Sequence, residues 1–134
     1  MVIMLVQEIM TRRIESINSD ETVTEACRKY KKHKLGSLIV MEEDTIVGII
    51  TERDVIEKII LDGKNPKLTF VKDIMTPNVK TINSLATIEE AVEIMKKHNI
   101  KKLPVVYNNI VVGIITENNI IYALEIFNKS LKIT

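Results

Sequence analysis

The sequence predicts an α/β fold built from two copies of one strand–helix–strand–strand–helix unit, which pair about a pseudo-twofold axis. Three observations predict it. The chain repeats itself without a gap, each copy alternates β-type runs with helical periodicity, and the composition is that of a globular protein, with 46% apolar and 28% charged residues. The 134 residues are enough to bury a core.

The repeat is visible when Val6–Thr11 is aligned with Val71–Thr76, which also places Val47–Glu52 over Val112–Glu117. Agreement over so many positions indicates a tandem duplication. Solenoids need three or more copies, so two copies predict instead that each half covers the exposed apolar face of the other.

The boundaries of the copies follow from a turn-rich stretch between them, which contains Gly63, Asn65 and Pro66. We therefore predict three parts: a first repeat at residues 1–61, a linker at 62–69 and a second repeat at 70–134.

The first half of each unit is predicted as a short strand followed by a helix. A capping-box pattern, Thr-x-x-Glu, opens the helix, apolar residues recur at helical spacing, and a basic run closes it where the helix dipole favours positive charge. The strands are expected at residues 13–17 and 78–82, and the helices from Thr22 to His33 and from Thr87 to His98.

The second half of each unit is predicted as a β-hairpin followed by a second helix. Two apolar runs are separated by a few polar residues, which is hairpin spacing. The runs are residues 38–41 and 46–51 in the first copy and 103–107 and 110–116 in the second, and the helices are residues 52–61 and 117–128.

Charge and composition exclude several classes of protein. With 19 Lys+Arg against 18 Asp+Glu and 4% aromatic residues, nucleic-acid binding is disfavoured. The apolar run Met1–Val6 is far shorter than the ~20 residues that span a bilayer and lacks the features of a signal peptide. One cysteine, Cys27, forms no internal disulfide and no cysteine-built metal site. We expect a cytoplasmic protein without a membrane segment.

The strand–helix junction of each copy is the main candidate for a ligand. Gly48 lies inside a strand, which often marks a close approach to the backbone. Thr51 and Asp54 follow at a helix start, where an anion is favoured. The hydroxyl suits a phosphate and the carboxylate a ribose diol. The alternative is that Thr51 and Asp54 only cap the helix. In the second copy Asn119 replaces the aspartate, which weakens both the reciprocal cap and any carboxylate directed at ribose.

Other polar residues carry weaker signals. Arg12 and Arg13 could neutralise a phosphate, or form a solvated rim. Cys27 falls on an apolar helix face and is expected in the core. His33 and His98 supply only two imidazoles, fewer ligands than zinc requires, so we predict no metal site. No catalytic constellation is recognised, and we expect a protein that is not an enzyme.

The duplicated unit and the recurring Ile-Met-Thr … Gly-Ile-Ile-Thr-x-x-Asp together resemble a tandem cystathionine β-synthase-type (CBS) domain pair, from about Val6 to Phe127. The resemblance implies that the repeats pack through their sheets into a pseudo-symmetric module. It also implies adenosine ligands (AMP, ADP, ATP or S-adenosylmethionine) in two clefts between the repeats, and a homodimer.

The resemblance also implies site residues. In the first site Asp54 would bind the ribose hydroxyls, Thr51 the phosphate, and Arg53 a phosphate of this or the neighbouring site. The base would lie near Thr11, Arg13, Ile14, Gly36, Ser37 and Leu38. The second site would use Thr116, Asn118 and Asn119, with the base near Thr76, Asn78, Val79, Lys102, Leu103 and Pro104.

Together with these observations, the resemblance implies a regulatory module for energy sensing, with an adenine nucleotide as regulatory ligand, no other cofactor, and an unknown effector protein that reads the change. One alternative is a scaffolding homodimer with vestigial clefts. Another is a nucleic-acid binder that uses its lysine-rich surfaces, namely Lys29, Lys31, Lys32, Lys34, Lys96, Lys97, Lys101 and Lys102.

Overall fold

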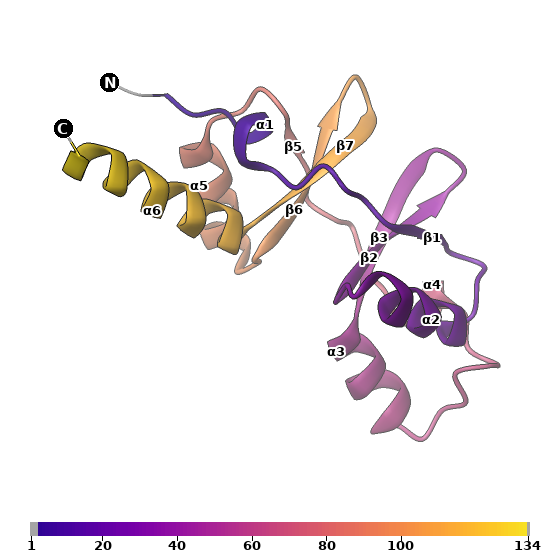
Figure 1. Ribbon diagram of the computed structural model, residues 1–134. Coiled ribbons are helices and arrows are strands. Elements are labelled where there is room, and N and C mark those ends of the chain that lie inside the picture. The colour runs from indigo at the N-terminus through magenta and orange to yellow at the C-terminus, as the bar shows by residue number, and fades with distance from the viewer. Residues whose placement is uncertain (1–2, 134) are drawn as a thin grey trace. The chain divides into compact units, whose positions relative to one another are not determined.

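The computed structural model describes residues 3–133, with the side chains of residues 3–130. Two compact units are present (Figure 1). Unit 2 is the continuous stretch Glu15–Val79, and unit 1 combines the N-terminal segment up to Ile14 with the chain from Lys80 onwards. The compact units and the sequence repeats therefore divide the chain at different points.

Unit 2 holds a four-stranded sheet in the order β1-β2-β3-β4. Strand β1 runs parallel to β2, and the other neighbours are antiparallel. Its elements are β1 (Ser16–Asn18), α2 (Val23–His33), β2 (Ser37–Glu42), β3 (Thr45–Thr51), α3 (Glu52–Val55), a π-helical turn (Ile56–Ile60), α4 (Val71–Ile74) and β4 (Thr76–Pro77).

Unit 1 holds a three-stranded sheet in the order β5-β6-β7, again with a parallel and then an antiparallel pair. Its elements are α1 (Val6–Ile9), β5 (Ile82–Asn83), α5 (Ile88–His98), β6 (Lys102–Tyr107), β7 (Ile110–Thr116) and α6 (Glu117–Ile133). Figure 1 shows the indigo helix α1 beside α5 and α6, far from it in the sequence.

The two units exchange the first segment of each repeat. In unit 1, Thr11 forms a β-bridge with Ile114, and the backbone N–H of each donates to the carbonyl of the other at 2.9 Å. In unit 2, β4 at the start of the second repeat pairs with β3 through Thr76 and Ile49. This pairing joins residues distant in the chain, so local periodicity did not predict β4.

The predicted α/β class and most elements are confirmed. The threonine N-caps form, with Thr22 Oγ1 accepting from the N–H of Glu25 at 3.3 Å and Thr87 Oγ1 accepting from the N–H of Glu90 at 3.2 Å, but the Glu25 side chain pairs with Arg28 and does not complete the predicted capping box. The first strands are shorter than predicted, because β1 pairs with β2 only from Ser16 onwards. Helix α6 is longer than predicted and continues to Ile133.

The interior of each unit is apolar. In unit 2 the core contains Val23, Leu38 and Ile50, and Cys27 packs against it, as expected from its apolar helix face. Burial raises the pKa of the Cys27 thiol above its ordinary value, with a smaller contribution from the nearby charge of Glu52. The core of unit 1 includes Leu103, residues of α5 and α6, and Val6 and Met10 of the exchanged segment.

The strand glycines have a structural reason. A Cβ atom on Gly48 would lie 2.5 Å from Sδ of Met75 and 2.8 Å from the carbonyl oxygen of Thr76. On Gly113 it would meet Met10 and Thr11 in the same way. The close approach expected at Gly48 is therefore made by the chain's own exchanged segment.

Candidate functional site

The junction between β3 and α3 is closed by Thr51 and Asp54. The backbone N–H and the hydroxyl of Thr51 both donate to Oδ2 of Asp54, at 2.9 and 3.1 Å, and the N–H of Asp54 donates back to Oγ1 of Thr51 at 3.1 Å. This is a complete capping box, so the capping interpretation of these residues is confirmed. It leaves Oδ1 of the carboxylate outside the cap.

The Oδ1 atom of Asp54 faces a lysine one turn further on. Lys58 Nζ lies 3.3 Å from it, and the same ammonium donates to the backbone carbonyl of Ile74 at 2.8 Å. The Asp54 side chain is 12% exposed and that of Lys58 is 41% exposed. A half-buried ion pair therefore joins the strand–helix junction to α4, which belongs to the exchanged segment.

The equivalent junction of unit 1 keeps the cap but changes its charge. The N–H and hydroxyl of Thr116 donate to Oδ1 of Asn119 at 2.9 and 3.0 Å, and the N–H of Asn119 donates to Oγ1 of Thr116 at 3.1 Å. The expectation that asparagine weakens the reciprocal cap is not reflected in this geometry. The amide Nδ2 of Asn119 also donates to Oγ1 of Thr11 at 3.3 Å. Lys58 aligns with Ala123, so this junction has no counterpart of the ion pair.

The structure groups two predicted site residues differently from what the family resemblance implied. Thr11, expected near Asp54, lies within hydrogen-bonding distance of Asn119 in unit 1. Thr76, expected near Asn119, pairs with Ile49 of β3 in unit 2, two residues before Thr51. The exchange of the first segments between the units is the physical reason, because each segment adds to the sheet of the other repeat.

Residues at the start of each hairpin lie beside the strand–helix junction of the same unit. The carbonyl of Gly36 accepts from the N–H of Glu52 at 3.0 Å, and Ser37 pairs with Thr51 across β2 and β3. In unit 1, Lys102 pairs with Thr116 in the same register. These contacts bring the predicted residues of each hairpin to the capping box of the same unit.

Other predicted residues differ in what they can offer a ligand. The side chains of Leu38, Leu103 and Pro104 are buried in the two cores, which leaves their backbone groups as the possible contacts. Arg53 is 85% exposed and its Nε lies 2.7 Å from Oε1 of Glu57, so it forms an ion pair on the helix surface. The remaining predicted residues are half-buried or exposed: Arg13, Ile14, Asn78, Val79 and Asn118.

Two polar residues near Asp54 were not predicted from the sequence as site residues. Lys58 follows Asp54 at the i,i+4 spacing of helical ion pairs, and that spacing could have indicated it. The hydroxyl of Tyr30 donates to the carbonyl of Ile50 at 2.9 Å. Burial, with smaller contributions from Cys27, Asp54 and Glu52, raises the pKa of the Tyr30 phenol, which therefore stays protonated as a donor. No sequence signal distinguished this tyrosine from an ordinary core residue.

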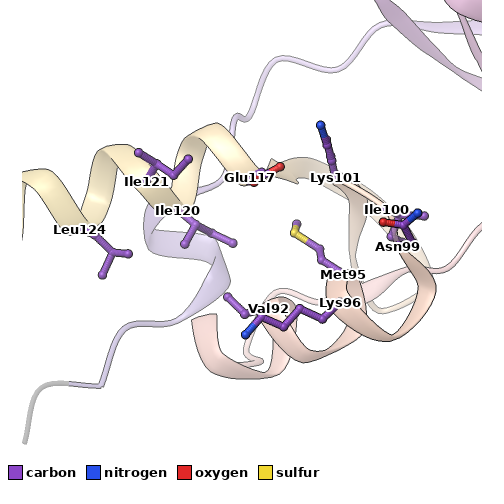
Figure 2. A pocket seen from close by; sticks show the side chains of 10 residues that line it. All are labelled: Val92, Met95, Lys96, Asn99, Ile100, Lys101, Glu117, Ile120, Ile121 and Leu124. Atoms are coloured by element: carbon purple, nitrogen blue, oxygen red, sulfur yellow. The ribbon is translucent and has the colours of Figure 1, made fainter.

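Unit 1 also carries an apolar groove between α5 and α6, of about 380 Å³ (Figure 2). Figure 2 shows Ile120 and Leu124 of α6 and Val92 and Met95 of α5 facing the same hollow, with Lys101 and Glu117 at one end. Leu124 is 54% exposed. The groove is thus an apolar surface that the described chain leaves uncovered.

The described part of the chain lacks two kinds of feature. Among its residues, no three histidine, cysteine or acidic side chains come together in a way that could hold a metal ion. Within the same described range, no helix is long and apolar enough to cross a membrane.

The profile of the CBS domain family matches residues 6–61 and 71–126. The chain therefore belongs to the CBS domain family, as a tandem pair, and its fold is that of such pairs.

Individual proteins are also similar to this chain in sequence and in fold. An uncharacterized protein of Methanopyrus kandleri is 36% identical over 118 residues, which cover 87% of this chain and 60% of the relative. A solved Burkholderia ambifaria protein with CBS domains superposes with a TM-score of 0.83 at 27% identity, covering 90% of this chain and 93% of the other. The hexameric CBS-CP12 protein of bloom-forming cyanobacteria has a TM-score of 0.82 at 30% identity, over 91% and 68% of the two chains. Proteins built on CBS pairs are generally regulatory modules.

Proposed function

We propose that this chain is a non-enzymatic regulatory module that binds an adenine nucleotide, of the class AMP, ADP, ATP or S-adenosylmethionine, and signals to a separate partner. Membership of the CBS family supports the class. The observation that carries the proposal is the Asp54 carboxylate, buried at a strand–helix junction with only one oxygen used by the cap. A carboxylate in that position is suited to accept hydrogen bonds from the two hydroxyls of a ribose.

The contacts of Asp54 indicate which of its oxygens a ligand would engage. Thr51 already occupies Oδ2 with two donors, so a diol engages Oδ1, the oxygen that faces Lys58. The ammonium then shifts from the carboxylate and becomes a cation available to the ligand's phosphate. Because Lys58 also donates to the carbonyl of Ile74, ligand binding changes how α4 is held. That coupling is the step that a partner would read.

The two junctions differ in affinity under this proposal. Asn119 presents no carboxylate, and its amide already donates to Thr11. A neutral amide accepts hydrogen bonds from a diol more weakly than a carboxylate does. The junction of unit 2 is therefore the stronger site and that of unit 1 the weaker.

We further propose that the module is a homodimer in which a second copy covers the groove between α5 and α6. The groove is lined by apolar side chains, including the exposed Ile121 and Leu124, and has lysines and a glutamate at its edges. Exposed apolar area of this kind is typical of protein interfaces. The hexameric assembly of the cyanobacterial relative is consistent with association of such modules.

Isothermal titration calorimetry with AMP, ATP and S-adenosylmethionine tests nucleotide binding. The matched variant is Asp54→Asn, because Asn119 shows that asparagine keeps the cap. We expect the substitution to weaken binding at least about tenfold, as the loss of a hydrogen bond to a charged group predicts. Absence of binding tighter than about millimolar, or equal binding by Asp54→Asn, contradicts the proposal.

Thermal denaturation separates this function from that of a scaffold. A ligand that binds only the folded state must raise the melting temperature. Saturating nucleotide that leaves the melting temperature unchanged would instead favour a scaffolding homodimer with vestigial clefts.

A further inference from the structure

A small pocket of about 230 Å³ lies on unit 1 at the far end of β6 from the capping box. Tyr107, the last residue of β6, lines it, whereas Lys102, the first, pairs with Thr116 of the junction. Six residues of extended strand separate these ends by roughly 17 Å. The pocket is therefore distinct from the junction assigned above to the nucleotide.

At the same place in unit 2, polar side chains of the protein bind to one another. Ser19 donates through its hydroxyl to Oε1 of Glu42 at 3.0 Å, and Lys72 Nζ lies 3.1 Å from Oδ1 of Asp20. Unit 2 thus places a carboxylate on a buried serine, with an ion pair at its side.

In unit 1 the serine remains but its acidic partner is gone. Ser84 aligns with Ser19, lines the pocket and is 3% exposed. Tyr107 stands where unit 2 has Glu42. The ion pair of Lys72 with Asp20 is likewise replaced, by Gln7 and Leu85, both of which line the pocket. Where unit 2 has a carboxylate, unit 1 therefore has an open space that is lined on one side by apolar side chains.

Unit 1 also has a cationic side chain at this pocket that unit 2 lacks at the aligned position. Arg12 lines the pocket and aligns with Pro77 of unit 2. Its Nη2 donates to the carbonyl of Gln7 at 3.2 Å, which holds the guanidinium over the end of α1. Arginine has five N–H donors in a fork that matches a carboxylate, so one bond to a carbonyl leaves donors for a ligand.

We propose that this pocket binds the carboxylate of a small organic acid. The carboxylate takes the place of the Glu42 group, accepting from the Ser84 hydroxyl and the Arg12 guanidinium, and the apolar body of the acid lies against Tyr107 and Leu85. The volume of about 230 Å³ is below the range usual for drug-sized ligands, which limits the occupant to a small acid.

The test is a nuclear magnetic resonance titration of the full chain with phenylacetate and butyrate. Phenethylamine and butylamine serve as controls of similar shape and opposite charge. We expect saturable shifts of the backbone amides of Ser84, Leu85 and Tyr107 in the millimolar range, as small ligands allow, with the amides of Asp20 and Glu42 unmoved. Shifts that do not saturate, or that the amines produce equally, overturn the proposal.

Two substitutions at one position sharpen the test. Tyr107→Glu restores the internal carboxylate of unit 2 and should abolish binding, whereas Tyr107→Phe should retain it. Arg12→Gln should weaken binding about tenfold, the loss expected for a charge-assisted hydrogen bond. Undiminished binding by Arg12→Gln contradicts the proposal even if Tyr107→Glu does not fold. None of these results depends on nucleotide binding at Asp54, so the two proposals fail separately.

Discussion

Asn119 donates from its amide nitrogen to the hydroxyl oxygen of Thr11 at 3.3 Å, across more than one hundred residues of sequence. The amide oxygen meanwhile serves the cap of α6. An aspartate could keep the cap but could not donate to Thr11, because a carboxylate has no hydrogen to donate. The aspartate-to-asparagine difference between the repeats is therefore also a structural difference, since it links the exchanged N-terminal segment to the junction of unit 1.

The Thr11–Asn119 hydrogen bond predicts non-additive stability effects. We expect Thr11→Val to lower the free energy of unfolding by about 0.5–1 kcal/mol. In an Asn119→Ala background the same substitution should cost less, because the side chain that bonds to Thr11 is already absent. Urea denaturation of the two single variants and the double variant measures the coupling. Additive losses would show that the hydrogen bond contributes nothing measurable.

Gly48 should not tolerate a larger side chain. The Cβ of Gly48→Ala would lie 2.8 Å from the carbonyl oxygen of Thr76. That oxygen belongs to the backbone, so it cannot be displaced without a large cost in free energy. We expect a loss of about 1–3 kcal/mol, as for other overpacked sites. The matched control is Gly36→Ala, whose Cβ would have its nearest neighbour, Cδ of Glu52, at 3.9 Å. Equal melting temperatures for the two variants would contradict the exchange of segments.

The Asp54–Lys58 ion pair should stabilise the chain more than an exposed pair does. We expect Lys58→Met to lower the free energy of unfolding by about 1 kcal/mol or more, because it removes the partner of a buried carboxylate and the hydrogen bond to Ile74. Arg53→Met is the control, since its pair with Glu57 lies on the exposed helix surface, is screened by solvent and should contribute little to stability. Denaturant titration of both variants gives the comparison.

The Cys27 thiol should be slow to react. Burial raises its pKa above the ordinary value of 9.0, so less thiolate is present at a given pH than in the unfolded chain. Alkylation by iodoacetamide should therefore be slower in the folded protein and rise at higher pH. The stability that this pKa difference contributes is fully present below the pKa of Cys27 in the unfolded chain. It is lost as the pH rises through the pKa of Cys27 in the folded protein. Alkylation at equal rates in folded and urea-unfolded protein would contradict this environment for Cys27.

The elements and caps were open to prediction because their signals are local. Thr22, Thr87 and Thr51 each accept a hydrogen bond from a residue three positions ahead, and a capping pattern records that distance directly. Strand β4 was not open to prediction, since Thr76 pairs with Ile49 through a contact that no local pattern encodes. The same holds for Thr11, which the family resemblance placed at the first site together with Asp54.

By itself the sequence determined the duplication, the order of elements in each repeat, the capping residues and the family. These depend on self-similarity and on interactions within about one helical turn or one hairpin. Only the tertiary structure decided which segment completes which sheet, why Gly48 and Gly113 lack side chains, and which partners Lys58 and Asn119 have beyond the cap. Those contacts join residues far apart in the chain, so they exist only once the two units have folded.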